Sequence, residues 1–383
     1  MHYHSLGKLP KKRHVTFLKQ DGTLHREHLF GLEGFSGIQS LAYKLDLPSA
    51  TLAIHDLPQP LPVVSDKSDS LTYRHLKTAE LGRNEDWLTS RIPLMFNQQV
   101  EISVGFGVPD TLFRNASHHE LWYLETGQGW LRSEFGNVQI CGGDYVVIPK
   151  GLTYQFQYSQ GDRFLLTQSL QPIRFPNRYL NRQGQFLEHS PICERDLKLP
   201  TVLETIDSCE ETKVTIRRHN RYFEQVMNHH PFDTVGWDGC YYPFAISIHD
   251  FEPIVGRLHL PPPIHQIFES AHFVVCNFVP RLFDFHPEAI PAPYYHSNID
   301  SDEVIFYIEG NFMSRSGIEP GSISLHPAGI PHGPQPGKTE ASVGQHSTEE
   351  LAVMIDTFEP LLLSSRALEI EECTYERSWI AKK

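Results

Sequence analysis

The sequence lacks three features that would each assign it to a common class of protein. It has no run of apolar residues near the ~18–20 that a membrane-spanning helix needs. It has no excess of positive charge, because 46 acidic residues against 33 lysines and arginines give a net charge of −13. Nucleic acids and anionic membranes both demand basic surfaces. The first residues also lack the apolar segment of a secretory signal peptide.

Closely spaced cysteines are missing as well. The six cysteines lie far apart in the sequence, at Cys141, Cys193, Cys209, Cys240, Cys276 and Cys373. No CxxC pair is present, so the pattern indicates a reducing compartment rather than a disulfide framework. We therefore expect a cytoplasmic protein whose partner is neither a nucleic acid nor a membrane.

Long helical periodicity is nearly absent too. The chain contains 28 prolines and 26 glycines, which punctuate short apolar runs throughout. Such runs between turns are typical of strands, and we expect them at residues 130–134, 145–148, 164–168 and 273–278. Short helices are expected only at 79–81, 200–210 and 219–227. This pattern predicts an all-β fold, a sandwich or a barrel.

One stretch, residues 291–337, carries the strongest chemical signal. It contains His296-x-Asn298-x4-Glu303-x6-Gly310, followed by Gly321-x5-Pro327-x-Gly329-x2-His332. Apolar and polar residues alternate between the two parts, which indicates short antiparallel strands. In a small barrel, His296, Glu303 and His332 can converge on one face. Two imidazoles and one carboxylate suit non-haem Fe(II), although ligand type alone also allows zinc or manganese.

The two-part pattern resembles the cupin signature, with Asn298 where a second histidine usually stands. The residues around these motifs, including Tyr294-Tyr295-His296 and Pro331-His332-Gly333-Pro334, resemble the homogentisate 1,2-dioxygenase family. Residues 231–239, PFDTVGWDG, share that resemblance. The family implies an Fe(II) enzyme that opens an aromatic ring with O₂, converting homogentisate to maleylacetoacetate in tyrosine and phenylalanine catabolism. It also implies a homo-oligomer, a trimer or hexamer.

An internal repeat supports a fold of two barrels. Residues 120–127 have the spacing of Glu303 to Gly310, and residues 143–154 have the spacing of Gly321 to His332. In this first copy, Phe113, Asn115 and Tyr154 occupy the positions of the ligand motif, and only Glu120 is kept. His118 and His119 lie nearby in a predicted turn. We therefore expect a bicupin of two jelly-roll barrels, in which only the C-terminal barrel binds metal.

The predicted organisation has five parts. They are an N-terminal β extension (1–100), a degenerate cupin barrel (101–175), a connecting segment (176–230), the catalytic cupin barrel (231–365) and a C-terminal tail (366–383).

The resemblance also implies roles for residues near the metal. A histidine upstream of the ligands acts as acid and base. Counting forward from Trp237 places it two residues past His259, whereas counting back from Phe268 places it three residues before His265. We favour His259 because a two-residue offset keeps the same face of a strand, and the choice between the two stays open. Asp302 competes with Glu303 as the carboxylate ligand, because the usual family gap is one residue shorter.

Substrate contacts are implied for five positions, which are Tyr295, Asn298, Phe312, His326 and His332. Two positions depart from the family: Ser297 stands where an arginine is usual, and Phe312 where a tyrosine is usual. Both changes remove polar groups, and Tyr294, Tyr295, Asn298 or Arg257 could replace them. The alternatives are a gentisate- or salicylate-type ring-cleaving dioxygenase and a non-enzymatic bicupin binding protein.

Overall fold

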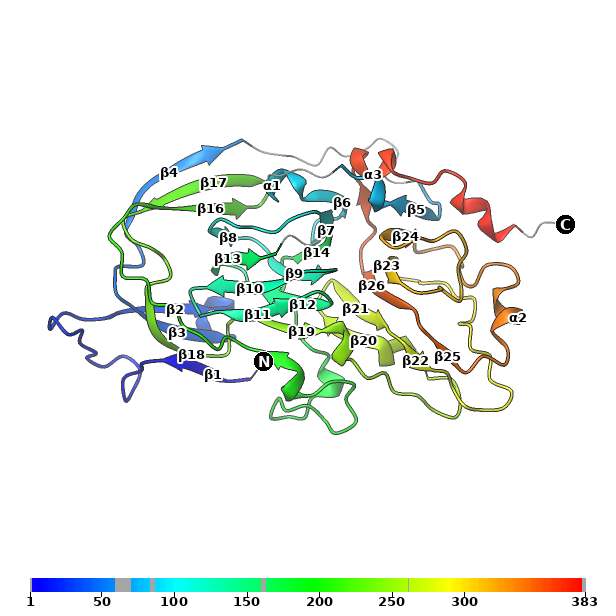
Figure 1. Cartoon of the computed structure of the whole chain (residues 1–383), viewed down its shortest axis with the longest axis horizontal. Coiled ribbons are helices and arrows are strands. Elements are labelled where there is room, and N and C mark those ends of the chain that lie inside the picture. Colours follow the sequence, from blue (N-terminus) through cyan, green and yellow to red (C-terminus); the bar gives the residue numbers. More distant parts are fainter. Residues whose placement is uncertain (1, 59–69, 83–86, 160–162, 261, 381–383) are drawn as a thin grey trace.

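The computed structural model describes residues 2–58, 70–82, 87–159, 163–260 and 262–380. Its regular structure consists mainly of antiparallel β-sheets (Figure 1). The four predicted strands all coincide with observed ones, namely β10, β12, β14 and β21. The all-β fold class is confirmed, and the sheets are arranged in two halves.

Two large sheets build the N-terminal half. One runs in the order β15 (Leu197–Lys198), β19 (Phe244–Ser247), β12 (Asp144–Ile148), β9 (His119–Leu124), β14 (Phe164–Ser169), β7 (Val100–Gly105), β6 (Ile92–Phe96) and β27 (Leu362–Leu363). The other runs in the order β11 (Val138–Cys141), β10 (Gln128–Ser133), β13 (Thr153–Tyr158), β8 (Phe113–Asn115), β16 (Thr212–Arg218), β17 (Arg221–Met227) and β4 (Thr51–Leu57). Trp122 of the first sheet packs against Phe156 of the second, with ring centroids 5.3 Å apart. The two sheets therefore enclose an apolar interior.

A six-stranded sheet forms the body of the C-terminal half. Its order is β20 (Gln266–Glu269), β21 (Phe273–Phe278), β26 (Leu351–Thr357), β23 (Asp302–Glu309), β24 (Ser322–His326) and β5 (Arg74–Lys77). A short pair, β22 (Arg281–Leu282) with β25 (Ser347–Thr348), lies beside it, and a single bridge joins His296 to His332. The long irregular segments between these strands lie on the side opposite the N-terminal half (Figure 1).

The two halves exchange strands and share one core. β5 comes from the N-terminal part of the chain and pairs with β24, whereas β27 comes from the C-terminal part and pairs with β6. Between the sheets, Tyr123 lies 6.3 Å from Phe306 and Tyr145 lies 5.5 Å from Phe268, measured between ring centroids. The Tyr145 hydroxyl also donates to Asn277 at 2.7 Å. Burial of these faces fixes the halves against each other.

The five ranges drawn from the sequence stay a prediction. The segment 176–230, expected to be a connection, contains β16 and β17, and β16 pairs with β8 in the seven-stranded sheet.

A four-stranded sheet ties the N-terminal residues to the rest of the chain. Its order is β1 (His4–Gly7), β18 (Thr234–Gly239), β3 (Gln39–Lys44) and β2 (Arg26–Gly31). The buried Lys44 amine donates to Asp233 at 3.0 Å and to the Pro231 carbonyl at 2.8 Å, and it pairs with Glu134 at 3.1 Å. Trp237 donates to the Phe135 carbonyl. The motif at 231–239 thus supports the fold.

The helical elements are short. They are α1 (Trp87–Ser90), α2 (Lys338–Ser342), α3 (Ser365–Glu369) and the 3₁₀ turns η1 (Glu33–Phe35), η2 (Thr78–Glu80), η3 (Asn177–Tyr179), η4 (Glu194–Asp196), η5 (Ile248–Asp250), η6 (Pro262–His265) and η7 (Tyr375–Trp379). None of the described helices is long and apolar enough to cross a membrane.

Two of the three predicted helices are wrong. Residues 219–227 contain the whole of β17, which is paired on both sides, by β16 and β4, and pairing of this kind outweighs local propensity. Residues 200–210 contain no helix. The third prediction, at 79–81, overlaps η2.

Candidate active site

Alternation along β23 places one set of side chains in a cavity and the other in the core. Val304, Phe306 and Ile308 join the main apolar cluster between the two halves. Glu303, Ile305 and Tyr307 point the opposite way and line a cavity of about 360 Å³. On the neighbouring strand β26, Ala352, Met354 and Asp356 face the same cavity, directly across from those three residues. The walls are mainly apolar, with the Glu303 carboxylate at one end and the carboxyl groups of Glu350 and Asp356 also in the lining.

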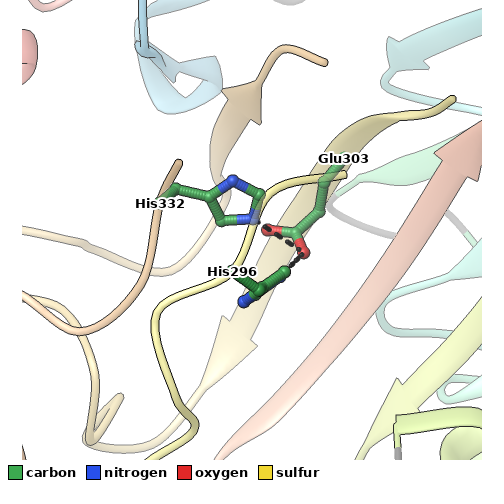
Figure 2. A group of neighbouring side chains, drawn as sticks. All are labelled: His296, Glu303 and His332. Atoms are coloured by element: carbon green, nitrogen blue, oxygen red, sulfur yellow. Dashed lines mark ion pairs between the residues drawn. The ribbon is translucent and has the colours of Figure 1, made fainter. Parts of the chain in front are cut away.

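His296, Glu303 and His332 meet at that end (Figure 2). The candidate ligand atoms all lie within 4.8 Å of one another. From Glu303 Oε2 the distance is 3.8 Å to His296 Nε2 and 3.4 Å to His332 Nε2. The two histidines come from separate loops, but their backbones form a pair of hydrogen bonds, each 2.8 Å long. The predicted ligands thus come together, and a two-strand bridge holds two of them.

A third histidine orients the carboxylate from behind. His326 is fully buried, and its Nδ1 lies 2.7 Å from Glu303 Oε1, while its Nε2 lies 3.2 Å from the Tyr375 hydroxyl. Burial lowers the pKa of His326 to about 4, so the ring is neutral and Nδ1–H donates to the carboxylate. Burial alone would raise the pKa of Glu303, but the three neighbouring histidines, one of which is hydrogen-bonded to it, hold that pKa well below its usual value. Glu303 is therefore an anion.

Asp302, the competing carboxylate, is occupied elsewhere. Its Oδ1 accepts the Ala328 N–H and its Oδ2 accepts the Leu361 N–H, both at 2.8 Å. Neighbouring residues of a strand point to opposite faces, so only one of the two can face the histidines. The structure places Glu303 there.

The donor set fits a divalent first-row metal ion. His332 is buried, and neither of its ring nitrogens has a hydrogen-bond partner. Buried polar groups are normally satisfied, so an unpartnered nitrogen aimed at a carboxylate indicates a missing ligand. Two imidazole nitrogens and one carboxylate oxygen suit Fe(II), and zinc or manganese can use the same set.

Both candidate acid/base histidines line the cavity. His259 is half-exposed, and its Nδ1 lies 3.7 Å from an Asp284 oxygen. Its ring packs edge-on against Tyr294, with centroids 5.2 Å apart. His265 is more enclosed: burial lowers its pKa to about 3, and its Nδ1 has no hydrogen-bond partner. Of the two, His259 has the carboxylate neighbour.

Of the five residues expected to contact substrate, two line the cavity and three do not. Asn298 and Phe312 line the cavity, and Phe312 packs on Tyr307 with ring centroids 4.6 Å apart. Tyr295 lies outside the cavity wall, 61% exposed, against Gly333. His326 and His332 stand behind the wall, at Glu303.

Four ionisable residues of the cavity wall were not identified from the sequence, namely Arg281, Arg315, Glu350 and Asp356. Asp356 lies opposite Glu303 across the β23–β26 pair, and burial followed by repulsion from Glu303 raises its pKa to about 8. Arg281 pairs with Glu350 at 3.0 Å, and Arg315 comes from the loop after β23. The alternation of inward and outward side chains along β26 is the one sequence signal that could have identified Asp356. Arg315 lies in a loop, where no periodic pattern marks it.

The corresponding position in the N-terminal half is filled by hydrogen bonds. Glu120 is fully buried and accepts from Asn115 at 2.9 Å, Gln168 at 2.8 Å and the Tyr154 hydroxyl at 2.5 Å. Arg91 lies 3.8 Å away. With its oxygens already satisfied, this carboxylate has no capacity left for a metal. Within the described residues, only His296, Glu303 and His332 form a ligand group.

Comparison with known proteins agrees with this geometry. The family model for the homogentisate 1,2-dioxygenase N-terminal domain matches residues 101–248, and the model for the C-terminal domain matches residues 252–383. SSO1533 of Saccharolobus solfataricus, which carries the provisional name of a dioxygenase, is 43% identical over 98% of each chain. The homogentisate 1,2-dioxygenase of Bradyrhizobium diazoefficiens is 29% identical over 67% of this chain and 60% of its own.

A solved structure, the cupin 2 conserved barrel domain protein from Leptotrichia buccalis, matches 80% of this chain and 100% of its own at 9% identity. Its TM-score of 0.28 is too low to support a structural conclusion.

Proposed function

Because the chain belongs to the homogentisate 1,2-dioxygenase family, we propose that it is an Fe(II)-dependent dioxygenase that converts homogentisate and O₂ to maleylacetoacetate. The observation that carries this proposal is the group of His296, Glu303 and His332 at the end of an apolar cavity. The match covers 60% of the length of the Bradyrhizobium enzyme. The identity of the substrate is therefore proposed here together with the activity.

His296, Glu303 and His332 would hold the metal. Fe(II) held there would supply a Lewis acid and an electron donor for O₂. His326 keeps the Glu303 carboxylate oriented through its 2.7 Å hydrogen bond. Partners of this kind fix both the direction and the basicity of a metal ligand.

The cavity suits an aromatic ring. Its volume, about 360 Å³, lies in the range of small-molecule sites. Ile305, Phe312 and Met354 supply apolar walls, which exclude water and place the ring next to the carboxylate end.

His259 is the group that we assign to proton transfer. Asp284 lies near its Nδ1, which leaves Nε2 to take the phenol proton and later return it. The carboxylate stabilises the imidazolium while the proton is held. His265, neutral because its pKa is about 3, would offer a hydrogen bond to the substrate rather than carry the proton.

Oxygen uptake by Fe(II)-loaded protein tests the assignment, with homogentisate and gentisate compared in parallel. Uptake with homogentisate supports the proposal. Uptake with gentisate alone would move the assignment to the gentisate-type alternative and would direct attention to Phe312. Metal analysis after anaerobic purification separates an iron enzyme from a zinc protein or a binding module without activity.

From family membership we also propose a cytoplasmic homo-oligomer, a trimer or a hexamer, with a small aromatic acid and O₂ as its partners. Light scattering during size-exclusion chromatography checks the assembly, because a monomeric mass would refute it.

A further inference from the structure

One buried arginine of the described chain has no carboxylate partner. Four arginines are buried, and three of them form ion pairs: Arg74 with Glu371 at 2.7 Å, Arg91 with Glu120 at 3.8 Å, and Arg217 with Glu101 at 2.7 Å. The fourth, Arg315, is only 6% exposed and makes no ion pair with any described residue. A buried charge is expensive unless it is paired, so this exception calls for an explanation.

The groups around Arg315 are neutral. Its Nη1 donates to the Gly333 carbonyl at 2.7 Å and to the Ser314 carbonyl at 3.2 Å. Its guanidinium lies 5.4 Å from the centre of the Trp379 ring, and the Tyr307 hydroxyl is close by. The Nε atom is buried and has no hydrogen-bond partner. These contacts fix the side chain in place but supply no carboxylate within ion-pair distance, although the negative charge of Glu303 still interacts with Arg315 from further away.

Two of the three acids in the cavity wall are committed elsewhere, and the third, Asp356, lies across the β23–β26 pair from Glu303 and makes no ion pair with Arg315 in the described structure. Glu303 accepts from His326 and faces His296 and His332, and Glu350 pairs with Arg281 at 3.0 Å. Arg315 lines the same cavity as these groups. The anion that would complete its surroundings is therefore one that enters the cavity.

We propose that Arg315 binds the carboxylate of the aromatic substrate and thereby selects aromatic acids over neutral phenols. This inference rests on the proposed function, because it assumes that the cavity takes an aromatic substrate. Guanidinium and carboxylate match in geometry, and charge-assisted hydrogen bonds are the strongest that a small anion can make.

The structure also shows why another residue is needed for this task. Ser297 is exposed and outside the cavity wall, and Phe312 offers only an apolar ring. Arg257 is exposed and does not line the cavity. Arg315 is the buried cation that stands in the wall, on the same loop as Phe312.

Binding measured without turnover tests the proposal. Anaerobic calorimetry on Fe(II)-loaded protein compares homogentisate with 2,5-dihydroxyphenylacetamide, which has the same ring but no charge. We expect the acid to bind the wild-type protein about 10-fold to about 100-fold more tightly. Equal affinities for the acid and the amide would overturn the proposal.

Variants then assign the preference to one residue. In Arg315→Gln the ratio between acid and amide should fall to near one, whereas Arg315→Lys, which keeps the charge, should keep part of it. Arg377→Gln is the matched control, because Arg377 is 76% exposed and lies close in sequence to Trp379. A ratio that stays at the wild-type value in Arg315→Gln would show that the arginine only supports the fold.

Failure of the two proposals can be told apart. Phenylacetate and phenylacetamide carry no ring hydroxyl and cannot be cleaved as dihydroxy substrates. If Arg315 governs the preference for phenylacetate while no dihydroxy compound consumes O₂, the carboxylate site stands and the ring-cleaving function falls. If O₂ uptake with homogentisate is normal and Arg315→Gln leaves the preference intact, the reverse holds.

Discussion

Replacing His326 with phenylalanine should weaken metal binding without touching a metal ligand. The change removes the 2.7 Å hydrogen bond from Nδ1–H to Glu303 Oε1 but keeps an aromatic ring, so the stacking on His332, at 4.7 Å between centroids, survives. A hydrogen bond to a buried charged group contributes about 1.5–3 kcal/mol. Loss of a partner that orients a ligand typically lowers metal affinity ~10-fold to ~100-fold. We expect a fall in that range.

A second buried histidine provides the control. His75 lies on β5, is 2% exposed, and bonds to the Ser322 hydroxyl at 2.8 Å rather than to Glu303. His75→Phe should cost about 0.5–1.5 kcal/mol of stability, the value of a neutral hydrogen bond, and should leave metal affinity unchanged.

Competition between the protein and a chelator for Co(II) or Fe(II), under anaerobic conditions, gives both affinities. His326→Asn should recover part of the loss, because its amide can donate to Oε1. If His326→Phe binds metal as tightly as the wild type, or if His75→Phe loses as much affinity as His326→Phe, then His326 has no specific role in orienting Glu303.

Three further predictions concern other residues. Glu303→Gln should abolish tight metal binding, whereas Asp302→Asn should leave metal binding intact. Asp302→Asn should instead lower the free energy of unfolding by about 1–3 kcal/mol, which denaturant titration measures. Equal metal binding by the two variants would contradict the choice of Glu303 as the ligand. His259→Gln should lower kcat ~10²-fold to ~10⁴-fold and remove one limb of the pH–rate profile, while His265→Gln should mainly raise KM; the opposite pattern would reverse the two roles. Burial lowers the pKa of His119 to about 3, below the value of 6.5 for an exposed histidine, so the unfolded state binds more protons below pH 6.5. His119 therefore lowers stability by up to ~1.4 kcal/mol for each unit that the pH falls from 6.5 towards 3, and His119→Gln should flatten the fall measured by thermal unfolding; an unchanged slope would refute its role.

The ligand motif could be read from the sequence because its information is local. His296, Glu303 and Gly310 keep a fixed spacing along one strand and its lead-in, and the period-two pattern of Val304, Phe306 and Ile308 fixes which face Glu303 occupies. The same logic identified Glu120 as the equivalent position in the other half.

Other parts of the site depend on contacts that spacing does not encode. Asp356 reaches Glu303 only through the register of β23 against β26. Arg315 reaches the cavity from a loop. That it has no carboxylate partner follows only from the three-dimensional structure, in which the other three buried arginines each form an ion pair. The prediction that Tyr295 contacts substrate has no support from its exposed position against Gly333.

The errors in secondary structure have a similar cause. Residues 219–227 were predicted as a helix on local pattern, but their pairing with β16 and β4 determines that they form β17. The exchange of β5 and β27 between the halves is likewise invisible in the sequence, because it joins segments far apart in the chain.

Product analysis with isotopically labelled O₂ tests the proposed ring-cleaving activity. Fe(II)-loaded protein is mixed with homogentisate under labelled O₂, and the product is identified by mass spectrometry. We expect maleylacetoacetate that carries both labelled oxygen atoms, and no such product from the Glu303→Gln variant. Homogentisate recovered unchanged from protein that holds one iron per chain, or a product without label, would contradict the proposed activity.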